Sequence, residues 1–386
     1  MVAYKILVES LMKRLFREGI KMCSQRSIFP LIYNINRKKP VKKGLVVFAD
    51  AHHEELPEHM RLLYDALKAR GMHVVKYCFD LSKLSKKEGF RRMTAFMKLY
   101  AISEYVVLCN NFIPVASCRK RPETKVIQLW HACGALKKFG YDAADDVPGW
   151  YKGNVYRNYD LVTVSGPDAV TPFRSAMRIE EDGVVRPVGV SESDRFFDEK
   201  LIGQLRKRFE KEYPEASGRY TVLWAPTFRG VAGDVVSADK PELPGEAEVD
   251  KLSTAREICV IKSLHPHQTG STPKLTTEEL MMCSDAVITD YSSISFQAVR
   301  FGVPVVYFAP DIDDYEKRRG FYLDYNSLPG IHPRENETLK DAVRRAISEG
   351  KSIYDNDSTA DFLDRYMSGC DGKATERIAD WITKEA

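Results

Sequence analysis

The chain has 386 residues, of which 44 % are hydrophobic and 29 % are charged. This composition is ordinary for a folded globular protein and argues against an intrinsically disordered chain, and the length allows two domains. The net charge of +4 conceals an asymmetry, because residues 1–43 hold eleven Lys or Arg against two acidic residues, whereas the remaining 343 residues are net acidic. The basic segment predicts an anionic partner, either a membrane or a nucleic acid.

The eight cysteines include no Cys-x-x-Cys pair, and several lie within apolar runs. We expect buried free thiols in a reducing compartment, with neither a disulfide framework nor a zinc site. The sequence shows no secretory signal peptide and no run of about 18 apolar residues that could span a bilayer. Any contact with a membrane is therefore expected to be peripheral.

The first expected element is a helix over residues 3–22. Its apolar residues fall on one face at helical spacing, and its lysines and arginines gather on the opposite face. A basic cluster follows at 38–43, so we interpret residues 1–43 as a membrane-associating segment that begins with an amphipathic helix. The alternative is an ordinary helix that packs on the protein and exposes its basic face to solvent.

From residue 44 onward, short β-branched runs alternate with helical patterns. This alternation predicts parallel sheets that are covered by helices on both faces. Strands are expected at 44–49, 73–79, 105–109, 125–130, 160–165, 220–225, 257–262, 285–289 and 304–308. Helices are expected at 56–70, 86–101, 200–212, 275–283 and 337–349.

The two sets of strands predict two doubly wound α/β domains. The boundary between the two sets of strands lies near residues 190–200, so we expect an N-terminal domain over 44–195 and a C-terminal domain over 196–386. Residues 230–250 are rich in Gly, Pro and acidic residues and are expected to form a loop. Ligands of such sheets bind at the carboxyl ends of the strands, so we expect the site in a cleft between the domains.

One strand runs into Trp130 and His131, which are followed by a turn of small residues and by Lys137. A histidine at this end of a strand faces a ligand site, and its ordinary pKa near 6.5 suits proton transfer. We expect His131 to take the proton of an attacking hydroxyl and Lys137 to bind substrate. The alternative is a histidine that only packs within the turn.

Another strand ends shortly before His265. A protonated imidazole there could neutralise the charge that develops on a pyrophosphate leaving group. Metal binding by His265 and His267 is the rival interpretation, but no third ligand is evident, and we expect no metal site.

The residues Asp290, Ser292 and Ser293 lie between a strand and a helical pattern. Free N–H groups and the helix dipole at such a junction favour phosphate. Helix capping by Asp290 or Ser292 is the plainer interpretation, and it is compatible with phosphate binding.

Further arginines are candidates for phosphate binding. Arg229 follows a strand end, two residues after Thr227, and either Arg318 or Arg319 could hold phosphate in a charged, tyrosine-rich loop after the strand 304–308. The sequence has no Walker A loop, no G-x-G-x-x-G after a strand, no H-E-x-x-H and no G-x-S-x-G. Kinase, NAD dehydrogenase, zinc peptidase and α/β-hydrolase interpretations therefore lose support.

Four segments together resemble the CDP-glycerol glycerophosphotransferase family of teichoic acid enzymes. They are QLWHACGALKKFG (128–140), SLHPH (263–267), ITDYSSISFQAVRFGVPVVYFAPD (288–311) and RRGFYLDY (318–325). The resemblance implies a GT-B-like fold of two Rossmann-type domains that face a central cleft, with the donor bound by the C-terminal domain. It also implies an inverting displacement that needs no metal.

The resemblance also implies roles for residues that match the family's motifs. The functional histidines match His131 and His265, and the phosphate-binding hydroxyl groups match Ser292 and Ser293, with Asp290 beside them. The arginines match Arg229, in a P-T-F-R block that contains Thr227, and Arg319.

The implied reaction is the transfer of glycerol phosphate from CDP-glycerol to a polyprenyl-diphosphate-linked disaccharide, in wall teichoic acid synthesis. CMP is released, no cofactor is used, and the enzyme works as a peripheral protein on the cytoplasmic face of the cell membrane. After Trp130 and His131 the chain reads A-C-G-A-L-K-K-F-G, whereas long-chain polymerases of the family tend to read G-T-P-x-K. This difference favours a primase. Gln297 stands where an acidic residue is expected.

Several alternatives remain at this point. The enzyme could transfer ribitol phosphate from CDP-ribitol or another polyol phosphate for a capsule, or it could be another GT-B nucleotide-sugar enzyme. A more distant alternative is a non-catalytic nucleic-acid-binding protein. We expect no nucleic-acid partner, because the chain beyond residue 43 is net acidic and its basic residues lack interleaved aromatic residues.

Overall fold

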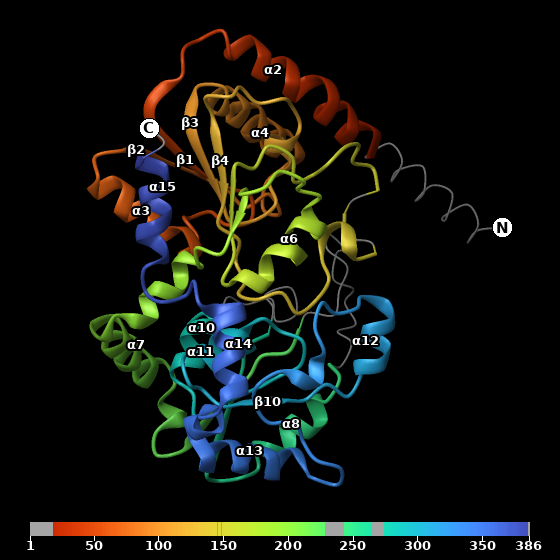
Figure 1. Ribbon diagram of the computed structural model, residues 1–386, viewed down its shortest axis with the longest axis vertical. Coiled ribbons are helices and arrows are strands. Elements are labelled where there is room, and N and C mark those ends of the chain that lie inside the picture. The colour runs from red at the N-terminus through yellow and green to blue at the C-terminus, as the bar shows by residue number, and fades with distance from the viewer. Residues whose placement is uncertain (1–17, 145, 148, 228–242, 265–273, 385–386) are drawn as a thin grey trace, which may run out of the picture.

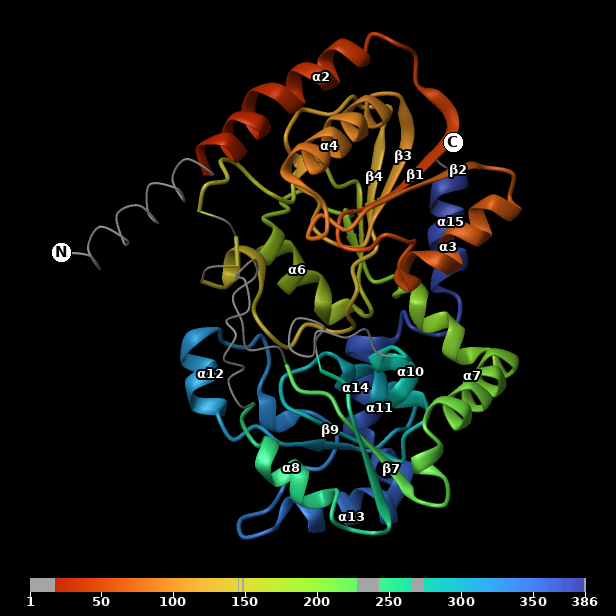
Figure 2. The ribbon, with the colours of Figure 1, turned by 180° about the vertical axis from the view of Figure 1, so that it is seen from behind.

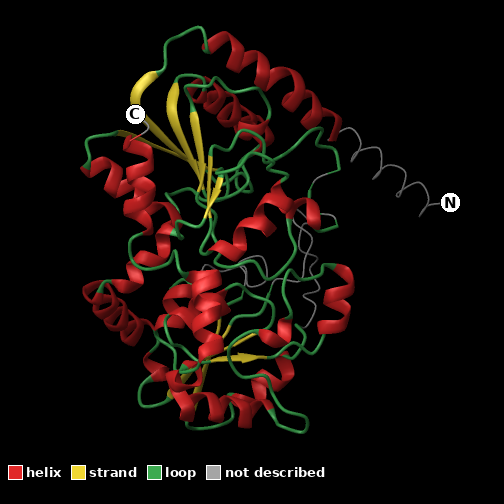
Figure 3. Cartoon of the chain, viewed as in Figure 1, coloured by secondary structure: helices red, strands yellow, loops and turns green. Residues whose placement is uncertain are grey.

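The structure is a computed structural model, which describes residues 18–144, 146–147, 149–227, 243–264 and 274–384. The candidates His265, His267 and Arg229 lie outside these residues, as do most of the helix predicted at 3–22 and most of the loop predicted at 230–250. The secondary structure of the described part is shown in Figure 3.

The first sheet has six parallel strands in the order β2-β1-β3-β4-β5-β6. Its strands are β1 (Lys42–Asp50), β2 (His73–Cys78), β3 (Ser103–Leu108), β4 (Lys125–Gln128), β5 (Leu161–Thr163) and β6 (Val185–Arg186). The five strands predicted for this region are confirmed. The edge strand β6 was not predicted, because two residues are too few to show an apolar pattern.

The second sheet has four parallel strands in the order β10-β9-β7-β8. Its strands are β7 (Tyr220–Trp224), β8 (Ile258–Lys262), β9 (Ala286–Thr289) and β10 (Val305–Tyr307). All four were predicted. Both faces of this sheet are buried, which is why these strands read as apolar runs rather than as alternating patterns.

Helices cover both faces of the first sheet (Figures 1 and 2). Leu45 and Val47 of β1 face a core that includes residues of α2, α4 and α6, whereas Val46 and Phe48 face one that includes residues of α3 and α15. These helices are α2 (Phe29–Asn36), α3 (Glu58–Ala69), α4 (Lys86–Tyr100), α6 (Val170–Met177) and α15 (Ala374–Lys384). The short helix α5 (Ile113–Ala116) follows β3.

The second sheet is covered in the same way. Leu223 of β7 faces a core shared with α7, α10, α11, α12 and α14, and Val222 faces a core shared with α8 and α13. The helices are α7 (Glu199–Glu212), α8 (Glu246–Leu252), α10 (Thr277–Met282), α11 (Ile294–Arg300), α12 (Ile312–Arg318), α13 (Leu339–Glu349) and α14 (Asp357–Met367). The helices predicted at 56–70, 86–101, 200–212, 275–283 and 337–349 are confirmed as α3, α4, α7, α10 and α13.

Two loop predictions were wrong in part. Residues 246–250, expected to be loop, lie in α8, which starts after Gly245 in a left-handed conformation with φ of 81°. The charged loop expected after residue 308 contains α12, whose Tyr315 is buried against Tyr291. Each of these helices is short and buries only a few residues. Its other residues are mostly charged, so the sequence shows no clear helical pattern of apolar residues.

The N-terminal helical region extends further than expected. Residues 18–23 are helical, Ser24–Ile28 form a π-helical turn, and α2 continues to Asn36. The π-helical turn ends two residues before Pro30, which has no N–H to donate within the helix. Strand β1 then starts at Lys42, so the last two lysines of the basic cluster belong to the first sheet.

The C-terminal helix α15 lies beside α3, next to the first sheet (Figure 1). Its Ile378, Ala379 and Ile382 join a core with Val46 and Phe48 of β1. The predicted boundaries 44–195 and 196–386 group this helix with the second sheet instead. The division into two domains at these boundaries stays a prediction.

Candidate functional site

Functional candidates follow the carboxyl ends of strands in both sheets, where ligands of parallel sheets bind. Cys109 follows β3 and His131 follows β4 in the first sheet. Thr227 follows β7 and Asp290 follows β9 in the second. The local fold therefore places candidates from distant parts of the sequence at equivalent positions of the two sheets.

The backbone turns sharply at Trp130, immediately before His131. Trp130 has φ of 55°, which ends β4 two residues earlier than predicted. A left-handed conformation is costly for a bulky residue and is typical of functional sites. The Trp130 ring packs between Phe139 and Phe173 and stacks on His131 at a centroid distance of 4.8 Å, so the imidazole plane is fixed.

His131 is held as one tautomer. Its Nδ1 lies 3.1 Å from the carbonyl oxygen of Cys109, which can only accept a hydrogen bond. Nδ1 therefore carries the hydrogen, and Nε2 of the neutral ring has a free lone pair. The His131 side chain is exposed to solvent, as contact with a substrate requires.

The environment of His131 also keeps the ring neutral. Surrounding protein disfavours the charged form, and the nearby positive charge of His59 adds to this, so the pKa of His131 is lowered. Solvent reaches one side of the ring and weakens this desolvation, but the effect of His59 has the same direction. A neutral His131 with a free Nε2 can accept a proton at pH 7.

Four of the eight histidines gather at this edge of the first sheet: His52, His53, His59 and His131. His59, on α3, lies with its ring centroid 6.2 Å from that of His131 and forms an ion pair with the buried Glu192. Desolvation lowers the pKa of His59, but Glu192, Glu278 and Glu58 outweigh it and raise the pKa to about 9.

Gly134 brings the turn after His131 against the second sheet's helix α11. It has φ of 65°, and a Cβ at this position would lie 2.3 Å from the ring of Phe296. The Gly134 N–H donates to Oγ of Ser165, which in turn donates to the carbonyl oxygen of Tyr366, both at 2.7 Å. Only glycine fits this turn, which explains the small residues seen in the sequence.

Three predicted substrate-binding residues meet at the second sheet. Lys137 Nζ donates to Thr227 Oγ1 at 3.4 Å, and the Thr227 N–H donates to Asp290 Oδ1 at 2.8 Å. Asp290 also accepts from the N–H of Tyr291, and it is only 4 % exposed. Asp290 thus organises the loops after β7 and β9, and Lys137 connects them to the turn that carries His131.

Arg319 joins the two halves of the chain. Its guanidinium donates to the carbonyl oxygen of Lys138 at 2.8 Å and pairs with Asp146 at 3.1 Å. In the segment 319–322, which follows α12, the Tyr322 N–H donates to the carbonyl oxygen of Leu136. The Lys138 N–H donates to the carbonyl oxygen of Gly320. Phosphate binding by Arg319 remains a prediction, and the structure gives this residue a structural role beside it.

Ser292 and Ser293 directly precede α11 and are partly exposed. Ser292 Oγ accepts from the Ile294 N–H at 3.4 Å, and Ser293 makes no side-chain cap. Their role as phosphate-binding hydroxyl groups stays a prediction. Gln297, in the same helix, is 5 % exposed, and its Oε1 has no hydrogen-bond partner among the described residues.

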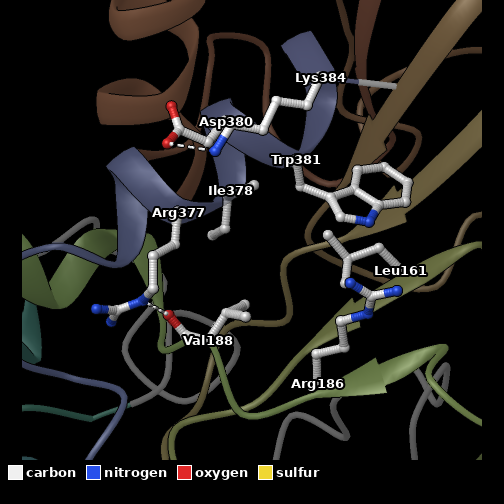
Figure 4. A pocket seen from close by; sticks show the side chains of 8 residues that line it. All are labelled: Leu161, Arg186, Val188, Arg377, Ile378, Asp380, Trp381 and Lys384. Atoms are coloured by element: carbon white, nitrogen blue, oxygen red, sulfur yellow. Dashed lines mark hydrogen bonds and ion pairs between the residues drawn. The ribbon is translucent and has the colours of Figure 1, made fainter. Parts of the chain in front are cut away.

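Among the described residues, no group of three or more His, Cys, Asp or Glu is arranged to hold a metal ion. A pocket of about 300 Å³ lies between β5, β6 and α15 and is lined by Arg186, Arg377 and Trp381, among others (Figure 4). None of the candidate site residues lines it. Arg377 donates to the carbonyl oxygen of Val188, as drawn there, and pairs with Asp371.

A comparison with protein-family models decides the family. Residues 31–384 match the model described as CDP-glycerol:poly(glycerophosphate) glycerophosphotransferase. The chain belongs to this family. The match extends over nearly the whole described part, including the turn with His131 and both sheets.

Proteins similar to this chain include primases for two polyols. The chain is 30 % identical to a teichoic acid ribitol-phosphate primase of Bacillus spizizenii over 89 % of this chain and 92 % of that protein. It is 26 % identical to a teichoic acid glycerol-phosphate primase of Bacillus subtilis over 72 % of this chain and 73 % of that protein.

Among solved structures, the wall teichoic acid polymerase TagF resembles this member of the family with a TM-score of 0.72. The alignment covers 99 % of this chain and 97 % of that one at 19 % identity. At this identity the likeness shows the fold, which is α/β with parallel sheets as predicted.

Sequence reasoning missed two charged residues next to His131. His59 lies in a helix with an ordinary pattern, and Glu192 lies in the segment read only as a junction between domains. Neither follows a strand or belongs to a recognisable motif. The only available signal was the number of histidines between residues 52 and 59, all following the first strand.

Proposed function

We propose that the chain transfers a polyol phosphate from a CDP-polyol donor to a hydroxyl group of a lipid-linked acceptor in teichoic acid synthesis. The observation that carries the proposal is the exposed His131, whose Nδ1 is held by the Cys109 carbonyl so that Nε2 is the basic atom, in a member of this family. The ribitol-phosphate primase, which is covered over 92 % of its length, supports addition of a first unit, because the ribitol-phosphate polymerases among the relatives are covered over a smaller share of theirs.

In the proposed reaction, His131 Nε2 takes the proton of the acceptor hydroxyl as its oxygen attacks the polyol-bearing phosphorus of the donor. The bond between that phosphorus and the oxygen of CMP breaks, and CMP leaves with the electron pair. Lys137 and the hydroxyl groups of Ser292 and Ser293 stabilise the phosphate charge, together with His265 and Arg229. Proton transfer of this kind contributes about 10²–10⁴-fold to a rate.

The donor is CDP-glycerol or CDP-ribitol. The sequence motifs favour CDP-glycerol, whereas the ribitol-phosphate primase has the higher identity and coverage of the two primases compared. We further propose a GT-B arrangement, in which the second sheet binds the CDP-polyol and the first sheet binds a polyprenyl-diphosphate-linked disaccharide.

The test is release of CMP from CDP-glycerol and from CDP-ribitol, each with and without a lipid-linked disaccharide acceptor. Acceptor-dependent release from one donor supports the transferase function and identifies the polyol. Absence of release from both, with no binding of CDP, contradicts it. Competition by UDP and ADP for the nucleotide site distinguishes this enzyme from other nucleotide-sugar enzymes.

We also propose that the enzyme acts as a peripheral protein on the cytoplasmic face of the membrane. Leu31 and Ile35 of α2 are 60 % and 56 % exposed, and Ile20, on the preceding turns, is 51 % exposed. These aliphatic side chains lie on a helical region rich in Lys and Arg, as in interfacial helices. In the described part of the chain, no helix has the length and apolar character needed to cross a bilayer.

A further inference from the structure

Beside His131 lies a buried pair of opposite charges that the proposed reaction does not use. His59 of α3 pairs with Glu192 of the 3₁₀ helix Ser191–Phe197, which connects the two sheets. Glu192 is 3 % exposed, and the His59 side chain is 23 % exposed. A carboxylate buried to this extent is stable only beside positive partners, and His59 is the nearer of the two cations that lie against Glu192.

The pair is fixed from the other side by Arg195 of the same 3₁₀ helix. Its guanidinium lies 4.0 Å from Glu192, 3.7 Å from Glu58 at the start of α3, and 2.7 Å from Glu279. Glu279 caps α10 of the second sheet through a reciprocal pair of hydrogen bonds with Thr276. His59 therefore occupies a rigid position that depends on elements of both sheets.

The charges around His131 come from three elements. His52, after β1, and His59, on α3, disfavour a proton on His131, whereas Glu192 favours one. The carbonyl oxygen of Cys109, after β3, orients the ring through Nδ1. Of the two histidines, His59 has the larger effect on His131, and its charge is maintained by Glu192, Glu278 and Glu58.

We propose that His59, held protonated by Glu192, is a positioning residue that keeps His131 neutral and its Nε2 available for the proton of the acceptor hydroxyl. After that proton has moved, the same positive charge repels it and drives its release from His131 to solvent, which restores the base. This inference rests on the proposed function, in which His131 is the base. A base weakened by a nearby charge is sufficient where the transition state of phosphoryl transfer is loose and positioning dominates.

The test is a titration of the histidine ring resonances in the full-length protein labelled with ¹³C-histidine. The variants are His59→Gln, which removes the charge, and His59→Lys, which keeps it. His73→Gln is the matched control, because His73 is exposed at the start of β2, at the opposite end of the sheet. The His131 and His59 signals are assigned by their absence from the His131→Gln and His59→Gln spectra.

We expect His59→Gln to raise the pKa of His131 by about 0.5–2 units, the effect of removing one charge at 6 Å. His59→Lys should leave the pKa near the wild-type value, and His73→Gln should not change it. In CMP release, the acid limb of the pH profile of kcat should move upward in His59→Gln and return in His59→Lys, with KM for the donor unchanged. A purely structural role for His59 would not move this limb.

An unchanged pKa of His131 in folded His59→Gln overturns the proposal. If this variant does not fold, the wild-type titration decides: His59 must be protonated at pH 7, and a His59 pKa below 7 overturns the proposal as well. Failure of the proposed function is a separate result, namely no CMP release by the wild type. The titration still shows in that case whether His59 controls the protonation of His131.

Discussion

Nδ1 of His131 donates its hydrogen to the carbonyl oxygen of Cys109 at 3.1 Å, which leaves Nε2 as the basic atom of the ring. Replacing His131 with Gln removes that base while keeping a polar side chain of similar length. We expect kcat for CMP release to fall by about 10²–10⁴-fold and donor binding to persist. His73→Gln serves as the control, and full activity of His131→Gln excludes His131 as the base.

Gly134 and Gly218 provide a matched pair for testing the turn after His131. Both have left-handed φ angles, 65° and 70°, but an added Cβ meets Phe296 at 2.3 Å only at Gly134 and meets nothing within 4 Å at Gly218. We expect Gly218→Ala to lower the free energy of unfolding by about 1 kcal/mol and Gly134→Ala by about 2–4 kcal/mol. Equal effects in urea unfolding would mean that the contact with α11 is unimportant.

The ion pair between His59 and Glu192 predicts how stability depends on pH. The raised pKa of His59 means that its contribution is complete below pH 6.5 and is lost as the pH rises through about 9. The pKa of Glu192 is lowered by His59 and Arg195 in spite of desolvation, so its contribution is present above pH 4.5 and is lost in acid.

The measurement compares the wild type with the double variant His59→Gln, Glu192→Gln by urea unfolding between pH 4 and pH 10. The difference in free energy of unfolding should be largest between about pH 4.5 and 6.5 and should shrink toward pH 9 and above. A difference that does not change with pH would contradict a charged pair.

Tyr322 links the segment 319–322, after α12, to the first half of the chain, because its hydroxyl group donates a hydrogen bond to Asp142 Oδ2 at 2.6 Å. Burial and the neighbouring Asp142 raise the pKa of this tyrosine, so the hydroxyl stays protonated and remains a donor. We expect Tyr322→Phe to lower the free energy of unfolding by about 1–2 kcal/mol. Tyr220→Phe, at an exposed position, should have little effect, and equal results for the two would show that the link is not stabilising.

The exposed aliphatic residues of α2 should contribute to membrane binding. We expect Leu31→Ser combined with Ile35→Ser to weaken sedimentation with phosphatidylglycerol vesicles by at least about tenfold, since each side chain contributes on the order of 1.5 kcal/mol when buried. Leu201→Ser is the control, because Leu201 is an exposed leucine on α7. Unchanged sedimentation of the double variant would assign membrane binding to another surface.

The sequence identified the two parallel sheets because strands such as β3 and β9 are buried on both faces and read as short apolar runs. It singled out His131 and Asp290 because each lies within three residues of the end of a strand. It missed α12 and extended the loop before α8 too far, because only a few residues of each short helix are buried.

The contacts between distant residues could not be predicted in the same way. The use of Arg319 to join Lys138 and Asp146 depends on how the two halves of the chain face one another, which no local pattern encodes. The same holds for the pair of His59 and Glu192, because the five strands from β2 to β6 lie between the two residues in the sequence. Local propensity specifies the elements, and only the assembled fold brings these charges together.

The position of α15 bears on the order in which the protein can fold during synthesis. Val46 and Phe48 of β1 are among the first core residues to be made, yet Ile378 and Ile382, which cover them, follow the entire second sheet. A nascent chain usually completes its first domain before the next is made. Here one apolar face of the first sheet stays partly uncovered until the last helix arrives, so truncation before residue 374 should expose that face and cause aggregation even though every strand is present.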